Sequence, residues 1–215
     1  MTEIPPSLKS GRVFEFIEDG HDHVWQSLLA QNPAQVAQRA QAGLVGDQVY
    51  LVDLFGDQYL FEAVARRVTG PENRPAPDKR VVLSLLHYLN GAQDKPLSGR
   101  LTPETVLPGG DRFFTGTHAL TRQPILKVFG RDGTALIQAA EKLGGQKVAS
   151  ESGSFSFMIS PLPRLRLQVT LCEEDEEFPA DLYFAFDSTS ADHVSLGILA
   201  SLVGLLNLFL TEGNK

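Results

Sequence analysis

The spacing of apolar residues predicts helices over the first half and the middle of the chain. Five segments repeat apolar positions every three to four residues: residues 22–29, 33–42, 79–90, 117–129 and 132–143. Asn32, which precedes Pro33, and Asp78 are typical helix starts, because their side chains accept hydrogen bonds from the free N–H groups of a first turn. The second helix is expected to stop at Gly43. Pro124 marks either the first turn of the fourth predicted helix or a kink within it.

Shorter apolar runs that end at turn residues predict strands. Six segments have this form: residues 13–17, 48–53, 58–64, 154–159, 165–171 and 182–186. Gly56 and Asp57 place a hairpin bend between the second and the third of these. The last three are joined by connections too short for crossovers, so we expect them to be antiparallel.

Residues 162–209 are the unit around which the chain is predicted to be organised. A strand, an acidic turn and a second strand lead into a long apolar helix, and the upstream chain is expected to cover them. This helix opens at residues 188–192, where Thr189 and Asp192 resemble a capping box, and continues to Leu210. Its apolar run over residues 196–210 is shorter than the ~20 residues of a membrane span, so we expect a core helix.

These elements predict an α+β fold in which an antiparallel sheet of C-terminal strands packs against helices, including a buried C-terminal helix. Residues 1–20 are interpreted as an N-terminal extension with one strand, and residues 21–215 as a single domain. Residues 69–77 contain three prolines and one glycine, which predicts a loop and a subdomain joint.

Composition narrows the classes of function. The chain has 215 residues and a formal net charge of -7, and its 19 Lys and Arg residues are scattered, so we expect no nucleic-acid partner. Cys172 is the only cysteine, which excludes a disulfide framework, a zinc knuckle and a cysteine-ligated cluster. The first residues do not resemble a secretory signal. We therefore predict a soluble, cytoplasmic protein without a membrane span.

The acidic turn at residues 173–177 is the first candidate for chemistry. Adjacent carboxylates repel one another, and a hard divalent cation such as calcium or magnesium relieves the repulsion. Asp175, Glu177 and Asp187 are the predicted metal ligands. The alternative is a solvated hairpin turn without metal. In either case Phe178 is expected to anchor the turn in the core, with Glu177 facing inward to Arg164 or Arg166.

The strand-to-helix junction at Asp187 is the second candidate. A carboxylate there either supports the helix start, or lies beside free N–H groups that hold an anion. His193 follows in the first helical turn, where the positive end of the helix dipole favours a neutral imidazole. Such an imidazole acts as a base or a metal ligand, or simply lies at the surface.

The remaining histidines and the aromatic residues give a third candidate. His87 lies among apolar neighbours beside Tyr88, and His118 follows Phe113 and Phe114. A metal or proton-transfer site requires His87, His118 and Asp187 to converge, and core packing is the alternative. The sequence leaves open whether His87, His118 and His193 converge. A further pair, His21 and His23, lies on one side of an extended segment but on opposite sides of a helix, and is a weak metal signal.

Short motifs resemble a known family in their order and spacing. They lie at residues 86–99 (LHYLNGAQDKPLSG), 107–110 (LPGG), 129–130 (FG), 143–145 (LGG), 162–164 (LPR), 175–180 (DEEFPA) and 186–187 (FD). In these motifs residues 25–210 are similar to the prokaryotic domain-of-unknown-function family 3786. Some relatives in this family carry iron–sulfur segments and come from anaerobes. The resemblance therefore implies a link to redox or corrinoid metabolism. This chain lacks the cysteines of such segments.

Two classes of function follow. In the first, an ordered middle loop (residues 94–116) and the sheet of residues 162–187 form a groove for a small ligand or a partner protein, which makes the chain an accessory binding module. In the second, the acidic region of residues 173–187 holds a divalent cation in an enzyme. A structural protein without a site is the remaining alternative. The predicted ligand-binding residues are His87, Tyr88, Phe113, Phe114, His118, Glu177 and Asp187.

Overall fold

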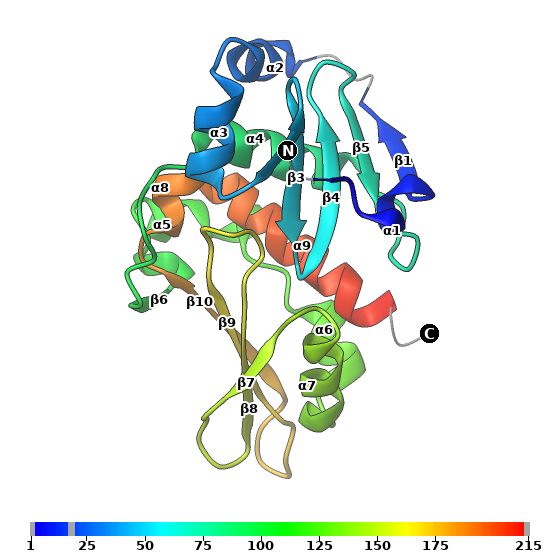
Figure 1. Cartoon of the computed structure of the whole chain (residues 1–215). Coiled ribbons are helices and arrows are strands. Elements are labelled where there is room, and N and C mark those ends of the chain that lie inside the picture. Colours follow the sequence, from blue (N-terminus) through cyan, green and yellow to red (C-terminus); the bar gives the residue numbers. More distant parts are fainter. Residues whose placement is uncertain (1–2, 17–19, 213–215) are drawn as a thin grey trace.

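A computed structural model of the protein describes residues 3–16 and 20–212, and within them the chain forms two antiparallel sheets (Figure 1). The first sheet has the strand order β1-β5-β4-β3-β2. Its strands are β1 (Arg12–Glu15), β2 (Gly43–Gly46), β3 (Val49–Leu54), β4 (Asp57–Glu62) and β5 (Arg67–Gly70). The predicted strand at residues 13–17 corresponds to β1, and its last residue, Ile17, lies outside the described residues.

The second sheet contains the predicted C-terminal strands and has the order β6-β10-β9-β8-β7. Its strands are β6 (Leu101–Pro103), β7 (Gln146–Val148), β8 (Ser154–Ile159), β9 (Leu167–Cys172) and β10 (Asp181–Asp187). The antiparallel pairing of β8, β9 and β10 is confirmed. The two edge strands, β6 and β7, have three residues each and were not predicted.

Helices lie beside and between the sheets. They are α1 (Pro6–Lys9), α2 (Asp22–Leu29), α3 (Pro33–Ala40), α4 (Lys79–Gly91), α5 (Gly110–Phe113), α6 (Gln123–Phe129), α7 (Gly133–Glu141), α8 (Ser190–His193) and α9 (Leu196–Glu212), with single 3₁₀ turns at Glu104–Val106 and Gly116–His118. The side chains of Asn32 and Asp78 cap α3 and α4 as predicted.

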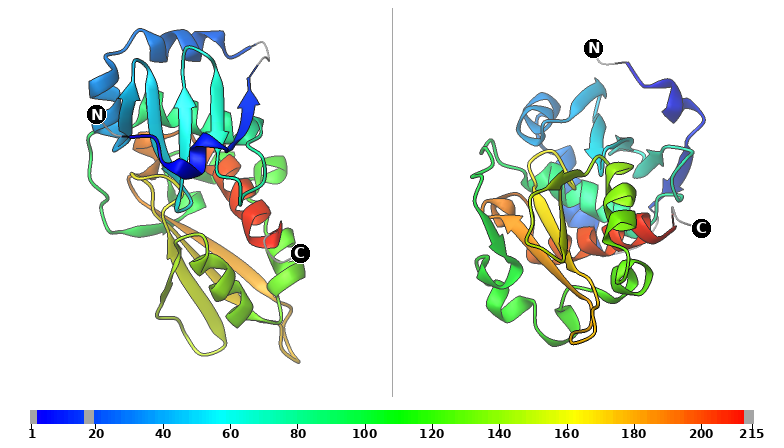
Figure 2. Two further views of the ribbon diagram at one scale, coloured as in Figure 1. Left: turned by 45° about the vertical axis from the view of Figure 1, so that its right-hand side comes forward. Right: turned by 90° about the horizontal axis from the view of Figure 1, so that it is seen from below.

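The α9 helix runs between the two sheets and packs against α4 (Figures 1 and 2). One hydrophobic cluster contains buried side chains from both sheets and both helices, among them Tyr50, Phe61, Leu85, Phe157, Phe184 and Leu202. The predicted α+β class and the buried C-terminal helix are therefore confirmed. No helix within residues 3–16 and 20–212 is long and apolar enough to cross a membrane. The division at residue 20 into an extension and a single domain stays a prediction.

The upstream chain does more than cover the C-terminal unit, because residues 12–70 build the first sheet. The helix predicted over residues 33–42 ends at Ala40, since Gln41 is left-handed with a φ of 52° and Gly43 starts β2. The loop predicted at residues 69–77 begins only at Pro71, because β5 extends to Gly70. The helix predicted over residues 117–129 is confined to α6, with Pro124 in its first turn.

The terminal helix is not continuous with the segment that opens it. Val194 is extended, with a φ of -145° and a ψ of 157°, and separates α8 from α9. Thr189 already has helical angles and its side chain caps no helix; its hydroxyl donates to Asp187 at 2.7 Å instead. The predicted capping box of Thr189 and Asp192 is therefore wrong.

Candidate functional site

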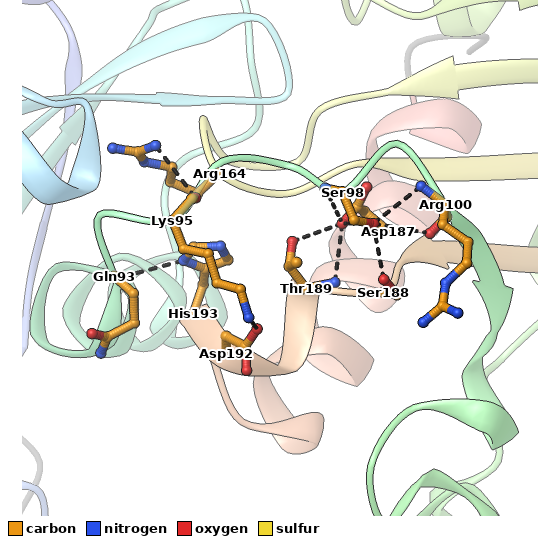
Figure 3. A network of polar contacts seen from close by, with 10 residues as sticks. All are labelled: Gln93, Lys95, Ser98, Arg100, Arg164, Asp187, Ser188, Thr189, Asp192 and His193. Atoms are coloured by element: carbon orange, nitrogen blue, oxygen red, sulfur yellow. Dashed lines mark hydrogen bonds and ion pairs between the residues drawn. The ribbon is translucent and has the colours of Figure 1, made fainter.

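Asp187 ends β10 and binds the segment that connects α4 to β6 (residues 92–100, here called the strap). Its side chain is 1% exposed. Its carboxylate accepts hydrogen bonds from Ser98 N–H and hydroxyl at 3.1 and 3.0 Å, and from Gly99 N–H at 2.8 Å (Figure 3). Two more come from the N–H and the hydroxyl of Thr189. The strap is thus attached to the end of the second sheet.

The electrostatics of Asp187 follow from this arrangement. Burial acts to raise the pKa of its carboxyl group, but the hydrogen bonds from Thr189 and Ser98 outweigh burial and lower the pKa to about 2. The group is therefore ionised at neutral pH. Because its oxygens already accept five hydrogen bonds, Asp187 has little capacity left for a ligand, and its predicted binding role stays a prediction.

His193 binds the same strap one helical turn further on. Its Nδ1 atom accepts a hydrogen bond from Gln93 N–H at 3.2 Å, and Lys95 Nζ lies 2.5 Å from a carboxylate oxygen of Asp192 (Figure 3). The imidazole is 1% exposed. Burial lowers its pKa, with Arg164 and Lys95 acting in the same direction and Asp192 opposing them. His193 is therefore a buried, neutral group.

The structure brings some of the predicted histidines together and separates others. His87 and His193 line one hollow of about 430 Å³, which His23 also lines. His118 is not among its lining residues; the exposed His118 ring stacks on Phe113 with 4.9 Å between centroids. The open question of convergence is thus answered for His87 and His193, and His118 lies apart from them.

The predicted aromatic residues lie in different environments. Tyr88 is fully buried, and its hydroxyl donates to Ala40 O at 2.8 Å and accepts from Arg164 N at 3.1 Å. Phe114 is buried, and Phe113 is half-buried at an edge-to-face contact with it. Packing and hydrogen bonds within the protein explain the positions of these three side chains. Their predicted role in binding stays a prediction.

The acidic turn is organised by hydrogen bonds. Glu173 accepts from Gly133 N at 2.5 Å, and Glu174 forms a bidentate pair with Arg131. Asp175 accepts from the N–H groups of Glu177 and Phe178 at 2.8 and 2.7 Å. Hydrogen bonding and the nearby Arg131 lower the pKa of Glu174, against the effect of burial. Three of the five adjacent carboxylates therefore have partners within the protein.

Two predictions about this turn are wrong. The Phe178 side chain is 65% exposed, so it does not anchor the turn in the core. Arg164 is directed to the strap, where it lies 2.7 Å from Asp94 and donates to Arg39 O, whereas Glu177 is exposed. Asp175 closes the turn locally, through the N–H groups of Glu177 and Phe178.

The predicted metal ligands are not brought together. Asp175 and Glu177 precede β10, whereas Asp187 ends it, and seven residues of extended strand span roughly 20 Å. Among the described residues, no group of three His, Cys, Asp or Glu side chains is placed to hold a metal ion. The geometry gives no support to a shared cation site at these three carboxylates.

A larger hollow lies elsewhere, on the second sheet. Alternation along β8, β9 and β10 directs Phe157, Val169 and Phe184 to the core and a polar set to the opposite face. That face lines a groove of about 990 Å³ (here called the sheet groove). Its strand residues are Ser154, Ser156, Gln168, Thr170, Cys172, Asp181 and Tyr183.

Two hairpin loops complete the sheet groove. Residues 149–153 join β7 to β8 and residues 173–180 join β9 to β10, and both loops lie at the end of the molecule far from the first sheet (Figure 1). Tyr183 is 53% exposed, and the pKa of its hydroxyl is raised by a hydrogen bond to Asp181 and by that carboxylate's charge. Arg122 lines one end, where it lies 2.6 Å from the buried Glu104.

The open face of the second sheet has a signal in the sequence, which the prediction of a groove did not include. In residues 154–157 and 168–172 polar or small side chains alternate with large apolar ones, which is typical of a sheet with one free face. The predicted groove combined the sheet of residues 162–187 with the middle loop. The structure instead lines it with the two hairpins, one of which contains the predicted Asp175.

Comparison with known proteins gives one match. A family model described as "Domain of unknown function (DUF3786)" matches residues 32–207. Neither the curated proteins nor the solved structures give a significant match to the chain.

Proposed function

We propose that this chain, which belongs to the family described as Domain of unknown function (DUF3786), is a binding module that holds a basic, extended segment of a partner protein in the sheet groove. The family description assigns no activity, so the proposal rests on the groove itself. The observation that carries it is a sheet face left open between two hairpins, with exposed aromatic rings at its edge.

The polar face of the groove suits a polypeptide backbone. Gln168 and Thr170 are half-buried on this face, and Gln168 Nε2 donates to the Thr170 hydroxyl at 3.3 Å. Hydroxyl and amide groups both donate and accept, so they match the alternating N–H and C=O groups of an extended chain. The open shape also suits a segment that enters and leaves at its ends.

Charge selects the kind of segment. Four carboxylates line the groove, from Glu151, Glu173, Asp175 and Asp181, against the single guanidinium of Arg122. Arg122 is already paired with Glu104, and its Nε donates to Leu182 O at 2.7 Å. The groove is therefore acidic within an acidic protein, and attracts lysine and arginine side chains by electrostatic complementarity.

The exposed rings add a second preference for cations. Phe178 and Tyr183 both line the groove and expose 65% and 53% of their surface. Ammonium and guanidinium groups bind over aromatic faces at about 0.5–1 kcal/mol each at exposed sites. A basic segment thus gains ion-pair and cation–π contacts in the same groove.

The alternative, a divalent-metal enzyme of the acidic region, is not proposed. Glu173, Glu174 and Asp175 are engaged with Gly133, Arg131 and the turn backbone, and Asp187 is engaged with the strap. The redox or corrinoid link implied by the resemblance has no counterpart among the contacts described above.

The test is fluorescence anisotropy with a labelled peptide that alternates lysine and serine. Wild-type protein is expected to bind it, and added salt weakens binding because the attraction is between charges. Phe178→Ala combined with Tyr183→Ala is expected to weaken binding about five- to thirtyfold, from the loss of two cation–π contacts. The matched control is Val106→Ala, since Val106 is similarly exposed outside the groove.

Three results contradict the proposal. A glutamate–serine peptide that binds equally well removes the role of charge. An unchanged affinity of the double variant removes the role of the groove. A free polyamine that binds as tightly as the peptide indicates a small-cation site in place of a protein partner.

A further inference from the structure

A second hollow, of about 430 Å³, is independent of the sheet groove and lies where α2, α4 and α8 meet. Its lining includes three of the five histidines, His23, His87 and His193, one from each helix. A fourth, His21, lies beside His87 with 6.3 Å between ring centroids. The hollow is here called the histidine hollow.

His193 contributes a hydrogen-bond donor that the protein leaves unused. Its Nδ1 accepts from Gln93 N–H, and a neutral imidazole that accepts at Nδ1 carries its proton at Nε2. The residue is 1% exposed, and no group in the described chain pairs with Nε2. Buried donors are normally paired, so this N–H is suited to an acceptor that the chain does not supply.

His87, like His193, favours its neutral form. It is half-buried, and burial lowers its pKa, with the neighbouring His21 and His23 acting in the same direction. Clustered imidazoles oppose one another's protonation, and an anion among them reverses this effect. The cluster therefore favours an anionic ligand over a cationic one.

The charges around the histidine hollow do not oppose an anion. Asp192 is the one carboxylate in its lining, and Lys95 neutralises it at 2.5 Å. The positive charges of Arg164 and Lys95 act on His193, and the carboxylate of Asp187, which acts in the opposite direction, is bound by the strap. Arg39 donates to the last carbonyls of α4, Leu89 O and Asn90 O, at 2.9 and 3.2 Å, which offsets the negative end of that helix dipole.

A helix start adds favourable potential. Ser195 lines the hollow, and α9, a helix of 17 residues, begins directly after it. The amino end of a long helix carries partial positive charge, which attracts anions. A divalent transition metal is the other ligand that imidazoles favour, but no three His, Cys, Asp or Glu side chains in the described ranges are placed to share one ion.

We propose that the histidine hollow is a binding site for a small oxyanion of the phosphate or carboxylate type, held by imidazole N–H groups of His23, His87 and His193. The anion accepts hydrogen bonds from the imidazoles, and its charge stabilises the protonated form of His87. Binding is therefore coupled to proton uptake and tightens as the pH falls from 7.5 toward 6.

The test is an NMR titration of the full chain that observes the imidazole resonances. Inorganic phosphate and citrate are added separately, at ionic strength matched with sodium chloride. Saturable shifts are expected at His23, His87 and His193, together with a raised pKa of His87. His118 is the internal control, since it lies outside the hollow. The anion that binds more tightly identifies the phosphate or the carboxylate type.

Variants decide whether the hollow itself is responsible. His87→Gln and His23→Gln are each expected to weaken anion binding about tenfold, because hydrogen bonds to charged groups are lost. His118→Gln is the matched control and leaves affinity unchanged. His193 is buried, so its substitution can impair folding. His23 is exposed, so His23→Gln tests the hollow without that effect. Absence of saturable shifts with both anions, equal shifts at His118, or stoichiometric Zn²⁺ binding that requires these histidines overturns the proposal.

Discussion

Asp187 binds Ser98, 89 residues earlier in the chain, through both the backbone N–H and the hydroxyl of the serine. Two of the motifs that carry the family resemblance, residues 86–99 and 186–187, therefore meet in space. Ser188 N–H donates to Arg100 O at 2.9 Å and extends the contact. An exposed polar strap is thus held in one conformation by a buried carboxylate, which makes Asp187 a structural residue.

Replacing this carboxylate is expected to destabilise the protein. Asp187→Asn keeps the size of the side chain but removes the charge that strengthens five hydrogen bonds, and it places amide N–H groups against other donors. We expect a loss of about 2–4 kcal/mol in the free energy of unfolding, measured by urea denaturation. Asp111→Asn, at an exposed position on α5, is the control and should change stability little. Equal effects of the two variants would show that the strap contact is dispensable.

Stability is expected to fall as the pH drops below about 6.5. The pKa of His193 is lowered in the folded protein by burial, so between its folded and unfolded pKa values the unfolded state binds more protons. Protonation also removes the acceptor that Gln93 N–H requires. Urea midpoints measured from pH 7.5 to pH 5 test this. The His87→Gln variant should still lose stability as the pH falls, and adding His193→Gln to it should make the midpoint depend less on pH. A slope unaffected by His193→Gln would assign the effect to other groups.

Tyr88 is expected to matter for stability and not for binding. Its buried hydroxyl bridges Ala40 O and Arg164 N, so Tyr88→Phe leaves both groups without a partner. We expect a loss of about 1–3 kcal/mol in the free energy of unfolding, with unchanged affinity for the basic peptide and for oxyanions. Calorimetric unfolding and the two binding assays measure these separately. A loss of either affinity in the folded variant would restore Tyr88 as a binding residue.

Gly110 is expected to tolerate no side chain. A Cβ atom there would lie 2.0 Å from the carbonyl oxygen of Glu104, whose side chain is paired with Arg122. Gly110→Ala should therefore lower the melting temperature strongly or prevent folding. Gly204→Ala is the matched control. Gly204 lies in α9, and a Cβ atom there would meet nothing within 4 Å. That control should be neutral, or stabilising by up to about 1 kcal/mol.

Local signals in the sequence were sufficient for much of the secondary structure. The α2 helix and the β8 strand have the predicted bounds, because each is a clear periodic run with turn residues at its ends. The strands β6 and β7 were missed because three residues carry no usable period. Their extended conformation comes from pairing with other strands. The β6 strand pairs with β10, which is far along the chain, and β7 pairs with β8, which follows it.

The candidate sites were less predictable, because contacts that decide them join distant segments. The sequence does not reveal that Ser98 and Gly99 engage Asp187, and so leaves its carboxylate open to a ligand role. Nor does it reveal that Asp94 engages Arg164 in place of Glu177. His87 and His193 were each singled out from local context, but their convergence depends on how α4 packs against α8.

The most direct test of the proposed function locates the bound peptide. A ¹H–¹⁵N correlation spectrum of the whole chain is recorded while the lysine–serine peptide is added. We predict saturable shifts concentrated on the sheet groove, at Ser156, Thr170 and Tyr183, with Val13 and Val64 of the first half of the chain unchanged. No shifts, or shifts centred on the histidine hollow or the first sheet, would contradict a partner-binding role for the open face of the second sheet.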